Sequence, residues 1–202
     1  MFRNNKEWAK EALESDAEFF SRWENVQEPK IFWIGCADSR VPPNIITKTQ
    51  PGDLFVHRNV ANVVSPSDIS IVSAVHFAIH YLKVKDIIVG GHYGCGGVRA
   101  SLAKNDFGPM EPWLANIRQL RSIHQDKLTG DANENEKTLI DLNVETQVYN
   151  VARIPSVQQA WKNGQELRIH GVVYDLSNGR LNEIISGVDS IDDIPDESVI
   201  IQ

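Results

Sequence analysis

The chain has 202 residues, of which 42% are hydrophobic and 23% are charged. These numbers describe one soluble globular domain over residues 1–202. They exclude a disordered or membrane-spanning chain, since no apolar run is long enough to cross a bilayer. The formal net charge of −7 excludes sequence-independent binding to nucleic acid, which needs a basic surface. We therefore expect a small-molecule partner, no nucleic acid and no membrane.

The first residues and the cysteine content indicate the compartment. Five acidic residues lie within the first 18 positions, and the apolar stretch of a secretory signal is missing there. We therefore expect a cytoplasmic protein, or one in an organellar matrix if a presequence has been removed. Two cysteines in such a chain favour metal binding or catalysis over a disulfide.

An amphipathic helix is predicted at the N-terminus, ending near residues 26–30 (VQEPK). The apolar residues that recur at roughly helical spacing are Trp8, Ala12, Phe19, Phe20 and Trp23. Two interpretations of the apolar face remain open. It packs on the core of its own chain, or it lies over a partner subunit.

Three short apolar runs predict buried strands, at residues 30–36, 53–60 and 85–91. A crossover helix is predicted over residues 67–83, because Ser67 and Asp68 are start signals and apolar residues follow at helical spacing. The second and third strands are therefore expected to run parallel.

The second half of the chain adds a hairpin and two loops. Residues 167–184 predict a strand, an Asn178–Gly179 turn and an antiparallel partner strand. Residues 104–112 predict a loop, and residues 129–138 a solvated connector. The whole pattern predicts an α/β fold with a mainly parallel central sheet flanked by helices, which binds ligands at the carboxyl ends of its strands.

Both cysteines fall at predicted strand ends. Cys36 closes the first strand, and His92 and Cys95 follow the third in an H-x2-C spacing. Two sulfurs and one nitrogen suit Zn²⁺, and three protein ligands leave the fourth position open for water, as in catalytic sites. The H-x2-C spacing alone is weak evidence, but Asp38 and Arg40 beside Cys36 strengthen the metal interpretation.

The remaining histidines are interpreted as structural. His76 and His80 are four residues apart in a predicted helix, but no HExxH glutamate accompanies them. We therefore expect packed core histidines there, and also at His57, His124 and His170. One of these could shuttle protons, although nothing in the sequence selects it.

Two segments, CADSR at residues 36–40 and HYGCGG at residues 92–97, resemble the signature motifs of the β-class carbonic anhydrases. Residues 51–62 (PGDLFVHRNVAN) resemble the central segment of that family, and the resemblance extends from about residue 3 to residue 185. It implies reversible hydration of CO₂ to bicarbonate and a proton. It also implies a homodimer or a tetramer of paired dimers, and zinc held by Cys36, His92 and Cys95.

Asp38 and Arg40 have chemical roles in this interpretation. Asp38 is close enough to the ligands to accept a hydrogen bond from the reacting water, and Arg40 restrains that carboxylate through charge-assisted bonds. Two thiolates neutralise the charge of the ion, so we expect an alkaline activity optimum. Gln27 stands where the family often has a substrate-binding glutamine, but an ordinary loop amide explains it equally well.

Three further residues resemble the positions that a bicarbonate-regulated (type II) subgroup uses to hold an inhibitory anion: Trp33, Arg58 and Tyr174. Arg58 would supply a positive fork, and the Trp33 N–H and Tyr174 O–H would donate hydrogen bonds. In that subgroup the aspartate equivalent to Asp38 leaves its arginine and becomes the fourth zinc ligand. Low pH is expected to favour this closed state.

Other functions were weighed against this one. A cysteine phosphatase would need Cys-x5-Arg, but Pro42 and Ser101 occupy the required positions. The glycine-rich segment at residues 90–97 lacks the Gly-Lys-Ser/Thr of a nucleotide-binding loop. A same-fold hydrolase of CS₂ or COS stays open, as does a catalytically silent bicarbonate sensor, although the intact Asp38 and Arg40 disfavour the sensor.

Overall fold

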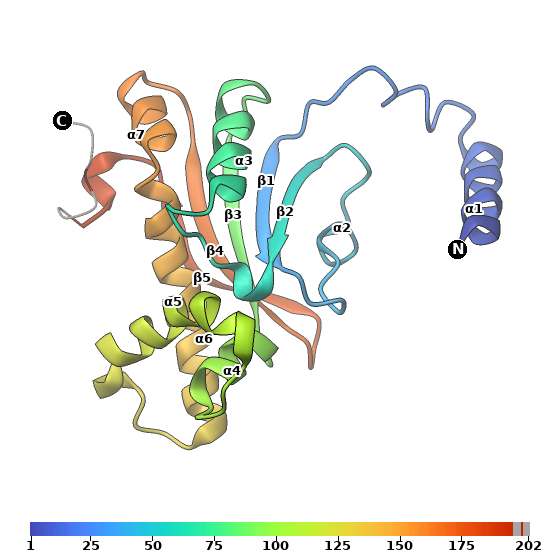
Figure 1. The fold of residues 1–202 in the computed structure, drawn as a ribbon. Helices are drawn as coiled ribbons and strands as arrows, with labels where there is room; N and C mark the ends of the chain where they lie inside the picture. The colour runs from blue at the N-terminus through green and yellow to red at the C-terminus, as the bar shows by residue number, and fades with distance from the viewer. Residues whose placement is uncertain (196–198, 200–202) are drawn as a thin grey trace.

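A computed structural model of the chain, which describes residues 1–195 and 199, is built around one five-stranded sheet (Figure 1). The strand order is β2-β1-β3-β4-β5, and only β5 runs antiparallel to its neighbour. The strands are β1 (Ile31–Cys36), β2 (Leu54–Asn59), β3 (Asp86–His92), β4 (Arg168–Asp175) and β5 (Arg180–Val188). This confirms the predicted α/β fold with a mainly parallel central sheet.

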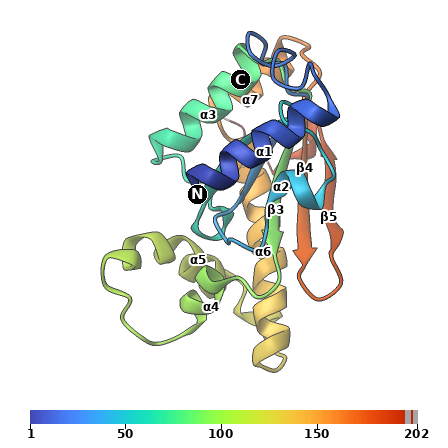
Figure 2. The same cartoon turned by 90° about the vertical axis from the view of Figure 1, so that its right-hand side faces the viewer.

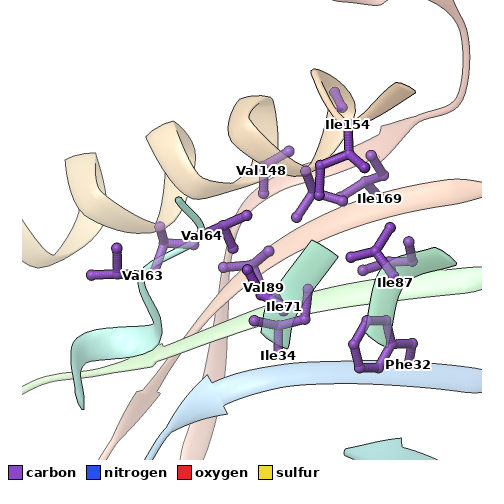
Figure 3. Close-up of a cluster of buried hydrophobic side chains, with 14 of the residues drawn as sticks. Phe32, Ile34, Val63, Val64, Ile71, Ile87, Val89, Val148, Ile154 and Ile169 are labelled. Carbon is purple, nitrogen blue, oxygen red and sulfur yellow. The ribbon is translucent and has the colours of Figure 1, made fainter. Parts of the chain in front are cut away.

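Three helices cover one face of the sheet: α3 (Ile69–His80), α6 (Ala132–Ala152) and α7 (Pro155–Lys162) (Figure 1). Alternate strand residues such as Phe32, Ile87 and Ile169 are paired in register and point towards these helices (Figure 3). Gly91 and Gly171 let α6 approach closely, because a Cβ at either position would lie 2.5 or 2.8 Å from Val144.

The remaining helices lie around this core. Two of them, α4 (Gly96–Leu102) and α5 (Glu111–Ile123), lie beyond the carboxyl ends of the parallel strands (Figure 1). The others are α1 (Phe2–Ser15), α2 (Pro43–Ile46) and the 3₁₀ turns η1 (Val60–Asn62), η2 (Gly108–Met110), η3 (Gln125–Lys127) and η4 (Ile191–Asp193). Among the described residues, none of the helices combines the length and apolar character needed to cross a membrane.

The N-terminal helix is shorter than the sequence pattern predicts. It ends at Ser15, because Asp16 is extended and its side chain accepts hydrogen bonds from the Glu18 N–H and the Arg22 guanidinium. The chain then turns back, and the Trp8 ring meets Phe19 and Phe20 edge-on, at centroid distances of 6.0 and 5.6 Å. The apolar residues that suggested one long helix therefore belong to two segments that pack against each other across a turn. This unit projects away from the rest of the fold in Figure 1, and in Figure 2, which is turned by 90°, it lies in front of the sheet and α3.

Two predicted loops are partly helical. The connector expected at residues 129–138 contains the first turns of α6, because the Asp131 side chain accepts hydrogen bonds from the Asn133 and Glu134 N–H groups. The Glu134 side chain bonds back to the Asp131 N–H. This is a capping box, which satisfies backbone N–H groups of the first turn, so the helix can begin inside a polar segment.

The loop expected at residues 104–112 ends earlier than predicted. After the single turn η2, α5 begins at Glu111, whose carboxylate accepts a hydrogen bond from the Phe107 N–H. Pro112 fits the first helical turn, where a missing N–H costs nothing.

The histidines of α3 are not packed in the core, so that prediction is wrong. His76 is exposed and His80 is half-buried, and their rings lie 4.4 Å apart on the solvent side of the helix. The core side of α3 is instead formed by residues such as Val75 and Ile79. The three others, His57, His124 and His170, are also half-buried rather than in the core.

Candidate metal centre

Three donor atoms converge at the carboxyl ends of the neighbouring strands β1 and β3. Cys36 ends β1, His92 ends β3, and Cys95 precedes the first turn of α4. All three side chains are buried, and their ligand atoms lie within 4.8 Å of one another. The two sulfurs are 3.9 Å apart. Gly94, with a φ of 72°, makes the tight turn that brings Cys95 back towards His92.

The imidazole of His92 is oriented as a ligand. Its Nδ1 lies 3.0 Å from the Tyr93 carbonyl oxygen, which can only accept, so Nδ1 carries the proton. Its Nε2 therefore presents a lone pair, and this buried atom has no hydrogen-bond partner among the described residues. A ring in which one nitrogen donates to a backbone carbonyl while the other is left free is typical of metal-binding histidines. The donor set therefore fits a divalent cation between the imidazole and the two sulfurs.

The two thiols have opposite pKa shifts because they share a hydrogen bond. This bond lowers the pKa of Cys36 to about 4, against the effect of burial, whereas the same bond and burial raise the pKa of Cys95. The nearby His92 imidazole and the backbone N–H groups of Asp38 and Ala61 also lower the pKa of Cys36. A divalent cation between the sulfurs would hold both as thiolates.

Asp38 lies next to these donors and is held by Arg40. The Arg40 Nε donates to Oδ1 at 2.9 Å and Nη2 to Oδ2 at 2.7 Å, and the Arg40 backbone N–H adds a third bond at 2.9 Å. The Arg40 hydrogen bonds hold the pKa of Asp38 far below its usual range. The Asp38 Oδ2 lies 3.6 Å from the His92 Nε2. An ionised carboxylate therefore faces the space between the donor atoms.

Trp33, Arg58 and Tyr174 all belong to the sheet face that the core helices leave uncovered. The Trp33 ring covers Gly35 and Gly90, since a Cβ at either glycine would lie 2.3 Å from it. Arg58 is paired in register with Gly35, so it shares that face.

Tyr174 is paired with His92, two residues beyond Gly90, and therefore lies on the same face. Its hydroxyl is near the hairpin turn, 3.8 Å from a Cβ built at Gly179. The Arg58 guanidinium donates to the carbonyls of Cys36, at 2.8 Å, and Asp38. The face with Trp33 and Tyr174 is thus connected to the backbone of the Asp38 segment.

Gln27 lies elsewhere. It is exposed in the segment between α1 and β1. Within this chain the structure therefore does not bring Gln27 to the metal donors.

The conformation of one segment of the site was not predicted from the sequence, although residues 51–62 resemble the central segment of the β-class carbonic anhydrases. Residues 59–64 run directly beside Cys36, and the Ala37 N–H donates to the Asn59 carbonyl at 2.7 Å. Ala61 and Asn62 have φ values of 62° and 47°, a left-handed conformation that neither residue type signals reliably. A glycine in this segment would have indicated a left-handed turn, but residues 59–64 contain no glycine.

The chain matches the family model described as carbonic anhydrase over residues 31–181. It is 39% identical to a carbonic anhydrase of Emericella nidulans over 186 residues, which cover 91% of this chain and 82% of the relative.

Solved structures give the same family. A Coccomyxa β-carbonic anhydrase in complex with acetazolamide is 37% identical, with a TM-score of 0.91 over 95% of this chain and 88% of that one. One of two tetrameric β-carbonic anhydrases from Sordaria macrospora is 36% identical, with a TM-score of 0.85 over 90% and 93%. Since the family model matches residues 31–181 and the chain shares the fold of solved β-carbonic anhydrases at 36–37% identity, it belongs to the β class of the carbonic anhydrase family.

Proposed function

We propose that the protein catalyses the reversible hydration of CO₂ to bicarbonate with zinc bound by Cys36, His92 and Cys95. The observation that carries this proposal is the buried, unpartnered Nε2 of His92 aimed at two sulfurs, with an ionised carboxylate 3.6 Å away. Zinc in such a donor set supplies a Lewis acid that makes water a nucleophile near neutral pH.

Asp38 and Arg40 orient the attacking water in this proposal. The Asp38 carboxylate, kept ionised by Arg40, accepts a hydrogen bond from the attacking water and fixes the direction of its lone pair. Arg40 also donates to the Gly94 carbonyl at 3.3 Å, which ties the carboxylate to the loop between His92 and Cys95. Because two thiolates offset the charge of the ion, we expect the water to be less acidic than in a three-histidine site and the activity optimum to be alkaline.

Stopped-flow measurement of CO₂ hydration, together with metal analysis, tests the proposal. We expect about one zinc per chain and rapid hydration that a strong chelator abolishes. Cys36→Ala and Cys95→Ala should lose both zinc and activity. A zinc-loaded protein that does not hydrate CO₂ would contradict the proposal, and activity towards CS₂ or COS in the same samples would support the alternative hydrolase. Binding of bicarbonate without any turnover would support the alternative of a bicarbonate sensor.

We also propose an inhibitory bicarbonate site at Trp33, Arg58 and Tyr174. Its support is the position of all three on one sheet face and the hydrogen bonds from Arg58 to the Cys36 and Asp38 carbonyls. An anion that draws the guanidinium away would remove these bonds from the Asp38 segment. Asp38 would then be free to leave Arg40 and take the fourth ligand position, which stops catalysis.

We propose a homodimer or homotetramer in which α1 covers a partner subunit. None of the residues of α1 is buried within the chain, and Trp8, Leu13 and Phe20 expose 48%, 47% and 37% of their surface. The similarity to the tetrameric Sordaria macrospora proteins supports an oligomer. Gln27, which follows this unit, would then be carried towards the partner's substrate.

We place the protein in a reducing compartment such as the cytoplasm, as one catalytic domain. Its two cysteines are free and buried, with sulfurs 3.9 Å apart, and the site needs both as thiolates. Fractionation of cells that express the chain would check this location, and recovery in an oxidising compartment would contradict it.

A further inference from the structure

The segment from Val60 to Val64 is held in a conformation that its sequence does not favour. Ala61 and Asn62 are non-glycine residues with left-handed φ values of 62° and 47°, and both are buried. Such conformations persist only where the surroundings impose them. The groups that impose this one should therefore be visible around the segment.

Helix α6 provides these groups. The Asn143 Nδ2 donates to the Ala61 carbonyl at 3.0 Å, and the Gln147 Oε1 accepts from the Val64 N–H at 2.8 Å. The Gln147 Nε2 donates to the Asn143 Oδ1 at 2.9 Å, which fixes the orientation of both amides. Both side chains are buried, at 1% and 3% exposure, so their hydrogen bonds are shielded from water.

The same segment adjoins the metal donors on two sides. The Ala37 N–H, directly after Cys36, donates to the Asn59 carbonyl at 2.7 Å, which ties the start of the segment to the strand end that carries Cys36. On the other side, the first turn of α4, which follows Cys95, packs against the segment so closely that a Cβ at Gly97 would lie 2.8 Å from Val60 and 3.0 Å from Ala61. A shift of the segment would therefore disturb the strand end that carries one ligand and the helix that follows the other.

We propose that Asn143 and Gln147 are positioning residues of the zinc centre, which act from α6 by holding residues 61–64 between the end of β1 and the first turn of α4. The inference rests on the zinc site of the proposed function. Contacts outside the ligands fix the orientation of the ligands and so tune the affinity for the metal. Neither amide contacts the ligands, so their effect passes only through the backbone of residues 61–64.

The test is the zinc affinity of Asn143 variants, measured by competition with a chelator at fixed pH. Loss of a direct contact to a metal ligand typically weakens metal binding about 10- to 100-fold. Asn143 acts one contact further from the ligands, so we expect the Kd to rise by about 10-fold, the lower end of that range. We expect this increase in Kd for Asn143→Ala and for Asn143→Leu, which replaces the amide by a branched apolar group and removes its hydrogen bonds without leaving a cavity. The sulfur-to-metal charge-transfer band of the cobalt-substituted protein should also shift.

Gln158→Ala is the matched control. The Gln158 amide is equally buried and donates to a main-chain carbonyl, that of Ala152 at 3.1 Å, away from the metal donors. We expect it to lower Tm as Asn143→Leu does but to keep the wild-type zinc Kd and cobalt spectrum. If the Asn143 variants match Gln158→Ala in Kd and spectrum, the proposal is overturned. Because these readouts need no turnover, they are independent of whether the wild type hydrates CO₂.

Discussion

Among the described residues, the hydrogen bonds of the Asp38 carboxylate come from Arg40, and this dependence can be tested at the level of single residues. Asp38→Ala and Arg40→Ala should retain zinc, because neither residue is a metal ligand as long as Asp38 is paired with Arg40. Both should lower kcat by about 100-fold or more, since orientation of the reacting group is lost in the transition state. Stopped-flow kinetics and metal analysis on the same samples measure the two effects.

Arg168→Ala is the control for these variants. Arg168 makes a similar forked contact with Asp86, at 2.9 and 3.3 Å, but at the amino ends of the strands. We expect it to keep the wild-type kcat. An Arg40 variant that is as active as Arg168→Ala would refute the role assigned to Arg40.

The lowered pKa of Asp38 also predicts a pH dependence of stability. Because the pKa is lower in the folded state than in the unfolded chain, the ion pair with Arg40 stabilises the fold above about pH 4, the usual aspartate range. This contribution disappears as the pH falls towards the folded-state pKa. The Tm difference between wild type and Arg40→Ala should therefore shrink between pH 7 and pH 3. A difference that grows on acidification would contradict the assignment.

At the level of elements, the exposed aromatic residues of α1 predict an oligomer. Trp8→Ala should weaken self-association, because it removes a large, half-exposed apolar side chain from a helix that has no fully buried residue in its own chain. Sedimentation at micromolar concentration should show an oligomer for wild type and a shift towards 22.7 kDa for the variant. Lys10→Ala, on the same helix but in an exposed pair with Glu14, should leave the mass unchanged. A monomeric wild type would exclude the proposed dimer.

For the whole molecule, the proposed inhibitory site predicts how activity depends on pH and bicarbonate. Wild type should be inhibited by added bicarbonate and should activate steeply as the pH rises, since low pH favours the closed state. Tyr174→Phe, which removes one hydroxyl, and Trp33→Ala should flatten the profile and reduce the inhibition. Because Trp33 is buried, its variant also loses packing, so Tyr174→Phe is the cleaner measurement. If the pH profile of the wild type is shallow and does not change with bicarbonate, the regulatory site is excluded. The proposed CO₂ hydration activity would still stand.

The sequence by itself determined the strands, the α/β class and the residues at the two strand ends. Continuous apolar runs such as residues 30–36 can only be buried strands or helices, and their length and flanking residues favoured strands. Since parallel strands end at the same edge of a sheet, Cys36 and His92 were expected at one edge. That they lie on adjacent strands follows from the strand order, which places β1 beside β3. The hydrophobic pattern and the general rules of sheet topology were therefore enough to predict the strands and their shared edge.

Only the tertiary structure decided the features that depend on contacts between distant segments. The end of α1 at Ser15 is set by Asp16 and by rings that meet across a turn. The left-handed Ala61 is imposed from α6 by Asn143, 82 residues away in the chain. Propensity and periodicity report what a segment prefers by itself, whereas these conformations are stabilised by partners that the fold brings into contact.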